Sequence, residues 1–242
     1  MTALLHRPLR PQLTDAAISP RPLRLSPVAE SIAADSGARS RRRIAKRALD
    51  IAVALLALIS LSPLLLAIAI LIKTDGGPAL YGHPRLSRGG RQFRCMKFRT
   101  MVIDSDHQLQ ELLAKDPAAA AEWAATQKLT ADPRVTPIGA VLRGTSLDEL
   151  PQLLNVLRGE MSLVGPRPIV EAEVPRYGDN IAYYFAMQPG VTGLWQVSGR
   201  SETTYARRVQ LDVAYVRNWS FWRDVLILLK TVPAVLARRG AV

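Results

Sequence analysis

The sequence predicts a membrane-associated α/β chain of the monotopic kind: a re-entrant broken helix, then a compact domain of helices, a small sheet and rigid loops. Three observations support this fold class. Residues 51–72 form an uncharged apolar run with a proline near its centre; short alternating stretches follow; helical patterns separated by Gly/Pro-rich turns fill the remainder. The 242 residues, 48% of them hydrophobic, suffice for a sizeable core.

The chain is strongly basic, because 32 lysines and arginines outnumber 20 acidic residues and give a formal net charge of +12. This balance favours an anionic partner, which could be nucleic acid, phospholipid headgroups or a phosphorylated small molecule. The single cysteine, Cys95, excludes an internal disulfide, and the three histidines show no repeated metal-ligand spacing. A disulfide scaffold and a histidine-rich zinc site are therefore not expected.

The chain divides into three predicted regions. Residues 1–43 are rich in proline, serine and arginine and lack apolar periodicity, which predicts a disordered basic tail. No signal peptide is expected, because the first long apolar run begins only at residue 51. Residues 44–74 are predicted to form the re-entrant membrane helix hairpin, and residues 75–242 the compact domain.

The apolar run is long enough to span a bilayer, but two features favour a hairpin that enters and leaves on one side. Pro63 removes the hydrogen bond to the carbonyl of Ile59, while the hydroxyls of Ser60 and Ser62 can satisfy the freed backbone. Basic clusters also flank both ends, and a hairpin keeps both on the cytoplasmic side. Each arm would be roughly 16 Å long. A kinked spanning helix is the alternative.

Local patterns predict the elements of the compact domain. Alternating residues in "RQFRCMKF" predict a strand or hairpin, and helices are predicted in "DSDHQLQELLAKD", "DPAAAAEWAATQKL" and "LPQLLNVLRGE", with Gly159 as the C-cap of the last. The prolines and glycines from "SLVGPRP" to "QPGVTGLWQVSGR" predict a set of rigid turns. The segment "SFWRDVLILLKTVPAVLARR" predicts a helix that lies on a core or in a membrane interface.

Two adjacent carboxylates, Asp148 and Glu149, stand out in "TSLDELPQL". One interpretation is structural: Ser146 followed three residues later by Glu149 matches a capping box at a helix N-terminus. Pro151 argues against it, because a helix that begins at Ser146 would need the missing N–H of this proline. If the helix begins nearer Leu150, both carboxylates stand just before its N-terminus, where they could face a ligand.

Basic side chains near this pair indicate a phosphate-binding site. Arg143 precedes the pair, Arg158 follows it, and Arg167 lies between two prolines that fix its backbone for bidentate phosphate contact. Lys97 and Arg99 alternate with apolar residues, so a strand would place both on one face. Such a basic face opposite two acids suits a phosphoanhydride with a metal ion.

Four segments together resemble the bacterial sugar transferase family, the monotopic phosphoglycosyl transferases. They are, in order, "KRALDIAVALLALISLSPLLLAIAILIK", "MKFRTM", "LRGTSLDELPQLLNVLRGEMSLVGPRP" and "PGVTGLWQVSGR". The resemblance covers about residues 44–240 and is closest to the short forms. It implies a catalytic domain on the cytoplasmic face of the inner membrane and a membrane helix broken at Ser62 and Pro63. The implied reaction transfers a sugar 1-phosphate from a UDP-sugar to undecaprenyl phosphate and releases UMP.

The resemblance also implies roles for individual residues. Asp148 would be the nucleophile that forms an aspartyl phosphosugar, and Glu149 with Asp148 would hold Mg²⁺. Lys97, Arg143 and Arg167 fall on positions associated with phosphate or nucleotide contact, and Arg200 with its neighbouring glycines would shape the nucleotide-sugar pocket. The "GLWQVSGR" segment is similar to members that handle glucose or galactose, in exopolysaccharide or capsule synthesis. The other implied partner is anionic membrane lipid, and the sequence indicates no oligomeric state.

Two other functions fit parts of the sequence. "DSD", Asp104 to Asp106, resembles the D-x-D metal site of glycosyltransferases that release UDP, although D-x-D is short and common and a cap at the N-terminus of the following helix is the favoured interpretation. A basic adaptor that uses residues 1–43 to bind nucleic acid or lipid would leave the Asp148–Glu149 segment unexplained. Nucleic acid is not an expected partner, because no recognised nucleic-acid module is present.

Overall fold

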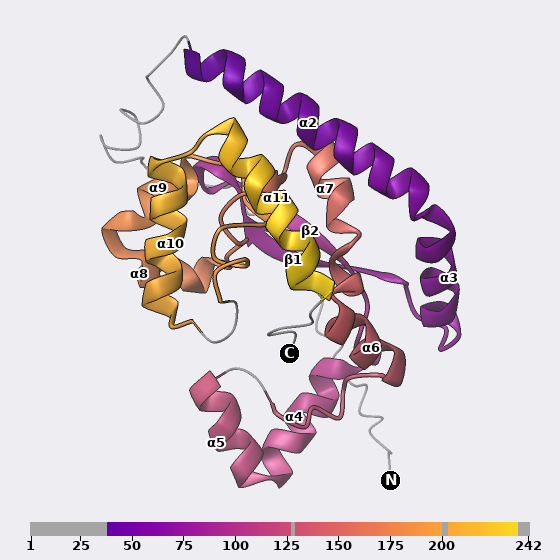
Figure 1. The fold of residues 1–242 in the computed structure, drawn as a ribbon. Coiled ribbons are helices and arrows are strands. Elements are labelled where there is room, and N and C mark those ends of the chain that lie inside the picture. The colour runs from indigo at the N-terminus through magenta and orange to yellow at the C-terminus, as the bar shows by residue number, and fades with distance from the viewer. Residues whose placement is uncertain (1–37, 127–128, 200–202, 237–242) are drawn as a thin grey trace, which may run out of the picture.

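The computed structural model describes residues 38–126, 129–199 and 203–236, which form a helix-rich α/β structure with two small sheets (Figure 1). The elements in chain order are α2 (Ala38–Ser60), α3 (Ser62–Lys73), β1 (Leu80–Leu86), η1 (Arg88–Gly90), β2 (Gln92–Phe98), α4 (Ser105–Lys115), α5 (Pro117–Thr126), α6 (Pro137–Thr145), η2 (Leu147–Glu149), α7 (Gln152–Arg158), β3 (Ser162–Val164), η3 (Glu171–Glu173), α8 (Val174–Tyr177), η4 (Gly178–Asn180), α9 (Ile181–Phe185), β4 (Gly190–Thr192), α10 (Tyr205–Arg217) and α11 (Phe221–Leu236).

The apolar run forms two helices that meet at Leu61, and the axes of α2 and α3 bend by 64° there. Pro63 lies in the first turn of α3, where its missing N–H costs least. The Ser62 hydroxyl donates to the carbonyl of Ile59 at 2.8 Å and so satisfies the acceptor that Pro63 cannot reach. The predicted break and its repair by a serine hydroxyl are therefore confirmed.

Within the described residues, no single helix is both long and apolar enough to cross a membrane, whereas the bent pair Arg42–Ser60 and Ser62–Lys73 meets those criteria together. Figure 1 shows α2 and α3 along one border of the molecule. The two arms are unequal, because α2 starts at Ala38, which is N-terminal to the boundary predicted at residue 43. The rest of the predicted tail, residues 1–37, lies outside the described residues.

The first half of α2 is fastened to the compact domain by buried polar contacts. Asp50 accepts hydrogen bonds from the hydroxyl of Ser162 at 2.8 Å and from the backbone N–H of Leu163 at 3.1 Å. Lys46 donates to the carbonyl of Val164 at 3.1 Å and to Asp224 of α11 at 2.5 Å. The N-terminal part of α2, which leads into the predicted hairpin, is therefore anchored in the core of the compact domain.

The predicted strand in "RQFRCMKF" is confirmed as β2, which pairs antiparallel with β1 so that Lys97 lies opposite Tyr81. One side chain of α7 fixes the position of this hairpin. The amide of Asn155 accepts from the N–H of Met96 at 2.9 Å and donates to the carbonyl of Arg94 at 2.8 Å. Since Asn155 is fully buried, the hairpin and α7 form one unit.

The segment predicted as turns alone also contains the short helices α8 and α9 and two short strands, none of which the sequence indicated. β3 and β4 pair in parallel, with Ser162 opposite Gly190 and Val164 opposite Thr192. Gly165 lies so close to Gly190 that a Cβ on either would overlap the backbone of the other, which explains the glycines at this crossing. The main core packs around this pair, with α2, α7 and α11 contributing to it.

Two peripheral features complete the fold. The helices α4 and α5 form a pair at one end of the molecule, away from α2 (Figure 1). The α11 helix confirms the predicted C-terminal helix, and four large apolar side chains on it are more than half exposed: Trp222, Leu226, Leu229 and Val232. Its placement in a membrane interface stays a prediction.

Candidate active site

Asp148 and Glu149 lie in the short 3-10 turn η2, between α6 and α7. Ser146 adopts the left-handed conformation with φ 59° and caps the C-terminus of α6, and its hydroxyl makes no cap hydrogen bond to η2. The capping-box interpretation is therefore wrong. The alternative is confirmed, because α7 begins at Gln152 and both carboxylates precede its N-terminus.

The two carboxylates share the ammonium group of Lys97, which β2 supplies from 52 residues away along the chain. The Lys97 nitrogen lies 2.7 Å from Oε1 of Glu149 and 3.6 Å from Oδ2 of Asp148. Asp148 is only 8% exposed, and burial raises its pKa above the ordinary value, while Lys97 and Arg143 act in the opposite direction. The result is a desolvated carboxylate beside a single lysine.

Arg143, near the C-terminal end of α6, is held by Thr100, which lies just beyond the end of β2. Its Nε donates to the hydroxyl of Thr100 at 2.9 Å, and the carbonyl of Thr100 accepts from the N–H of Thr136 at 3.0 Å. Gly139 packs directly against that carbonyl, where a Cβ would overlap it. These contacts fix α6 against the segment that follows β2, so the backbone that carries Arg143 is held rigidly.

A small open cleft is lined by three of the predicted residues, whereas Asp148 and Arg143 do not line it. Lys97, Glu149 and Arg167 line it, as expected, and so do Arg85 and Cys95, which the sequence did not single out. Arg167 also stacks over the Trp195 ring, with its guanidinium carbon 5.3 Å from the ring centroid. Side chains alternate between the two faces along each of the paired strands β1 and β2. This alternation is the signal that could have placed Arg85 on the same face as Lys97.

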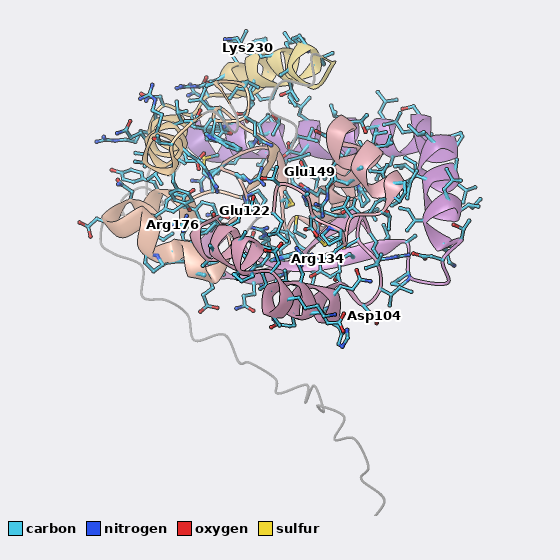
Figure 2. The ribbon with its side chains drawn as sticks, turned by 90° about the horizontal axis from the view of Figure 1, so that it is seen from below. Asp104, Glu122, Arg134, Glu149, Arg176 and Lys230 are labelled. Atoms are coloured by element: carbon cyan, nitrogen blue, oxygen red, sulfur yellow. The ribbon has the colours of Figure 1, made fainter. Side chains whose placement is uncertain are left out.

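Other predicted residues lie elsewhere. Arg99 does not join Lys97, because it follows the end of β2 and binds both carboxylate oxygens of Asp75, at 2.7 and 2.5 Å. Arg158 is exposed at the far end of α7. Arg200 lies outside the described residues. Asp104 occupies the cap position of α4 without a side-chain cap bond, and Figure 2 shows it at the edge of the molecule, away from Glu149.

The chemistry of the donor set is compatible with Mg²⁺. Within the described residues, no group of three or more histidine, cysteine, aspartate or glutamate side chains could hold a metal ion. Mg²⁺ does not need such a cage, because it commonly takes one or two carboxylates and completes its octahedron with water and substrate phosphate oxygens. Asp148 and Glu149 offer that number of carboxylates at the mouth of a cationic cleft.

Comparison with known proteins identifies the family. The model described as "Bacterial sugar transferase" matches residues 41–238, which is most of the chain. The chain belongs to this family. Its match begins within the part of α2 that precedes the apolar run and ends just beyond α11, so the bent helix pair and the cleft both lie inside it.

Curated bacterial sugar transferases resemble the chain closely. It is 57% identical over 204 residues to an uncharacterized sugar transferase of Haemophilus influenzae and 53% identical over 204 residues to undecaprenyl-phosphate galactose phosphotransferase of Salmonella typhimurium. The match covers 84% of this chain but 43% of each relative. ExoY, an exopolysaccharide production protein of Rhizobium meliloti, is 52% identical over 199 residues, which cover 82% of this chain and 88% of ExoY.

Proposed function

We propose that the protein transfers a hexose 1-phosphate from a UDP-sugar to undecaprenyl phosphate and releases UMP. The observation that carries this proposal is the buried Asp148 beside Glu149 and Lys97, before the N-terminus of α7 and at the edge of a cleft lined by arginines. Relatives named for undecaprenyl-phosphate galactose and UDP-glucose:undecaprenyl-phosphate glucose-1-phosphate transfer support the substrate classes.

In the first half of the reaction, a carboxylate oxygen of Asp148 attacks the β-phosphorus of the UDP-sugar. An O–P bond forms to Asp148, the bond from that phosphorus to the bridging oxygen breaks, and UMP leaves with the electron pair. Lys97 favours the ionised form of Asp148 and so opposes the effect of burial, and Arg143, fixed by Thr100, offers a guanidinium to the phosphoryl oxygens. A magnesium ion bound by Glu149 and Asp148 would neutralise charge on the diphosphate.

In the second half, the phosphate oxygen of undecaprenyl phosphate attacks the same phosphorus and displaces the Asp148 carboxylate. The product is undecaprenyl diphosphate sugar, and Asp148 returns as a free carboxylate. Each half inverts the configuration at phosphorus, so the overall reaction retains it. The intermediate separates two anionic substrates in time, which suits a cleft of this limited size.

This chemistry requires access to a lipid, and the bent pair α2–α3 is the element that we propose provides it. The pair would enter the cytoplasmic face of the inner membrane and return, with the exposed apolar stripe of α11 in the interface. Basic side chains at the N-terminal end of α2 would then contact anionic lipid headgroups. The reaction would start an exopolysaccharide or capsule repeat unit, with glucose or galactose as the first sugar.

The decisive experiment incubates the protein in membranes or detergent with UDP-sugars, Mg²⁺ and undecaprenyl phosphate, and measures UMP. We expect UMP with UDP-glucose or UDP-galactose, and a phosphosugar adduct on Asp148 by mass spectrometry when the lipid is omitted. Asp148→Asn should abolish both. Asp104→Asn is the matched control, because it makes the same change in the D-x-D segment at the edge of the molecule.

Other outcomes favour the alternatives. Release of UDP that depends on Asp104 rather than Asp148 would indicate a D-x-D glycosyltransferase. Deletion of residues 1–43 tests the basic adaptor, since we expect sugar phosphate transfer to survive it. Turnover by the wild type without any adduct on Asp148 would overturn the covalent mechanism.

A further inference from the structure

We propose that Arg85, paired with Arg167, forms a phosphate monoester subsite at the end of the cleft opposite Lys97. This subsite receives in turn the phosphate of the departing UMP and the phosphate of the incoming lipid. The inference rests on the proposed function and assigns a role to Arg85, which neither the sequence motifs nor the relatives' names indicate.

The register of the β1–β2 hairpin places Arg85 on the floor of the cleft. Arg85 lies opposite Phe93, and Lys97 lies opposite Tyr81, so the two cations point to the same face of the hairpin from opposite ends. Four residues of strand separate them, which corresponds to about 13 Å between their backbones. Both side chains line the cleft, and Cys95 lies between them on the same face. A cation therefore stands at each end of this face, and the Lys97 end also carries the carboxylates of Glu149 and Asp148.

Arg85 and Arg167 form a pair of like charges that is held in place. The Arg85 guanidinium donates to the carbonyl of Pro168 at 3.2 Å, and so binds the residue next to Arg167. Glu173 lies 3.6 Å away and holds it from the other side. Burial lowers the pKa of Arg85, and the positive charge of Arg167 lowers it further. Two guanidiniums that line the same cleft, one of them fixed by these contacts, offer a preorganised site for a phosphate dianion.

The charges around this pair leave a cationic excess. Arg208, which is only 7% exposed, lies 3.4 Å from the same Glu173 carboxylate and 4.0 Å from Asp212. Burial raises the pKa of Asp212 to about 6, so part of its negative charge is lost near neutral pH. Three guanidiniums thus face two carboxylates within the described part of the chain. An anion in the cleft would compensate the excess, which is costly in a desolvated site.

The in-line geometry of phosphoryl transfer explains why one subsite serves both phosphates. In the proposed reaction the attacked phosphorus would lie beside Asp148, which is at the Lys97 end, and the leaving oxygen would depart on the opposite side. After UMP has left, the lipid phosphate must approach the same phosphorus along that same path. A cleft with cations at both ends offers one place for the two groups that occupy this path in succession.

Titration of the full-length protein with UMP tests the subsite without turnover. Arg85→Gln should weaken UMP binding by roughly tenfold or more, because one charge-assisted bidentate contact is lost. Arg85→Lys keeps the positive charge but lacks the two-pronged guanidinium, so it should restore part of the affinity for UMP. Arg94→Gln is the matched control, since Arg94 is exposed on the neighbouring strand of the same hairpin and does not line the cleft. Equal UMP affinity in Arg85→Gln and wild type would overturn the proposal.

Steady-state kinetics measure the effect of Arg85 on each of the two ligands separately. The shared subsite predicts that Arg85→Gln raises both the inhibition constant of UMP and the KM for undecaprenyl phosphate, and that UMP competes with the lipid. A change confined to either ligand would overturn the sharing. If the wild type consumes no UDP-sugar but binds UMP through Arg85, the proposed reaction fails and the anion site stands. If the reaction proceeds and Arg85 is dispensable for both ligands, the subsite alone fails.

Discussion

Replacement of Lys97 by methionine tests how the site keeps a buried carboxylate reactive. The change preserves the length and volume of the side chain but removes the only ammonium group that the described structure places within 4 Å of both carboxylates. At 3.6 Å from Asp148, one unit charge contributes between about 1 kcal/mol in water and about 5 kcal/mol at an effective dielectric constant of 20. The Lys97 side chain is 28% exposed, so screening favours a value near 2 kcal/mol.

The expected result is a loss of kcat/KM of up to roughly 30-fold on the acid limb of the pH profile, where Asp148 is mostly protonated, because each 1.4 kcal/mol corresponds to tenfold. The loss should become smaller as the pH rises. The pH profile should change as well. Burial already raises the pKa of Asp148, and Lys97 opposes this rise, so its removal raises the pKa further. The ionised form that attacks phosphorus is then reached only at higher pH, and the acid limb of kcat/KM should move in the alkaline direction.

The assay is UMP release measured from pH 5 to pH 9 with saturating lipid. Lys115→Met is the matched control, because Lys115 forms an exposed pair with Glu111 at 3.8 Å and lies on the peripheral helix α4. We expect this control to behave as the wild type. An unchanged acid limb in Lys97→Met, whatever the loss of rate, would refute the argument that Lys97 acts through the ionisation of Asp148.

Three further predictions concern the supports of the site. Thr100→Val should lower kcat/KM about fivefold, because Arg143 loses one hydrogen bond, whereas Thr100→Ser should restore it; steady-state kinetics checks both. Lys46→Met should reduce the free energy of unfolding by about 3–5 kcal/mol in chemical denaturation, since it leaves Asp224 buried without its cation; a loss below 1 kcal/mol would contradict this. Cys95, whose thiol pKa burial raises to about 11, should react with a maleimide at pH 8 only after unfolding; rapid labelling of the folded protein would contradict its position in the floor of the cleft.

Much of the fold could be predicted from the sequence because its determinants are local. The break at Leu61 follows from Pro63 and from the hydroxyl of Ser62, which repairs a carbonyl three residues away. The β2 strand follows from alternation, and the C-terminus of α7 follows from Gly159, which adopts a left-handed conformation with φ 79°. Each of these features depends on neighbours within one turn or one strand.

The β3–β4 pair could not be predicted in the same way. Its two strands are three residues long and lie more than 25 residues apart, within a segment that proline and glycine dominate. What holds them is the close approach of Gly165 to Gly190 and the packing of α11 against both strands. The capping-box interpretation of Ser146 failed for a related reason, since α6, which ends there, was not foreseen from its sequence.

The sequence by itself determined the chemical components of this protein: a carboxylate pair at Asp148 and Glu149, the cations of the site, and an apolar helix that must bend. Only the tertiary structure decided which cations meet the carboxylates. Lys97 contacts both carboxylates, whereas Arg99 pairs with Asp75 instead. Arg85 lines the cleft from the opposite end of the β1–β2 hairpin. The physical reason is that strand register and helix packing set these distances between residues 24 or more positions apart in the chain, and no local pattern encodes them.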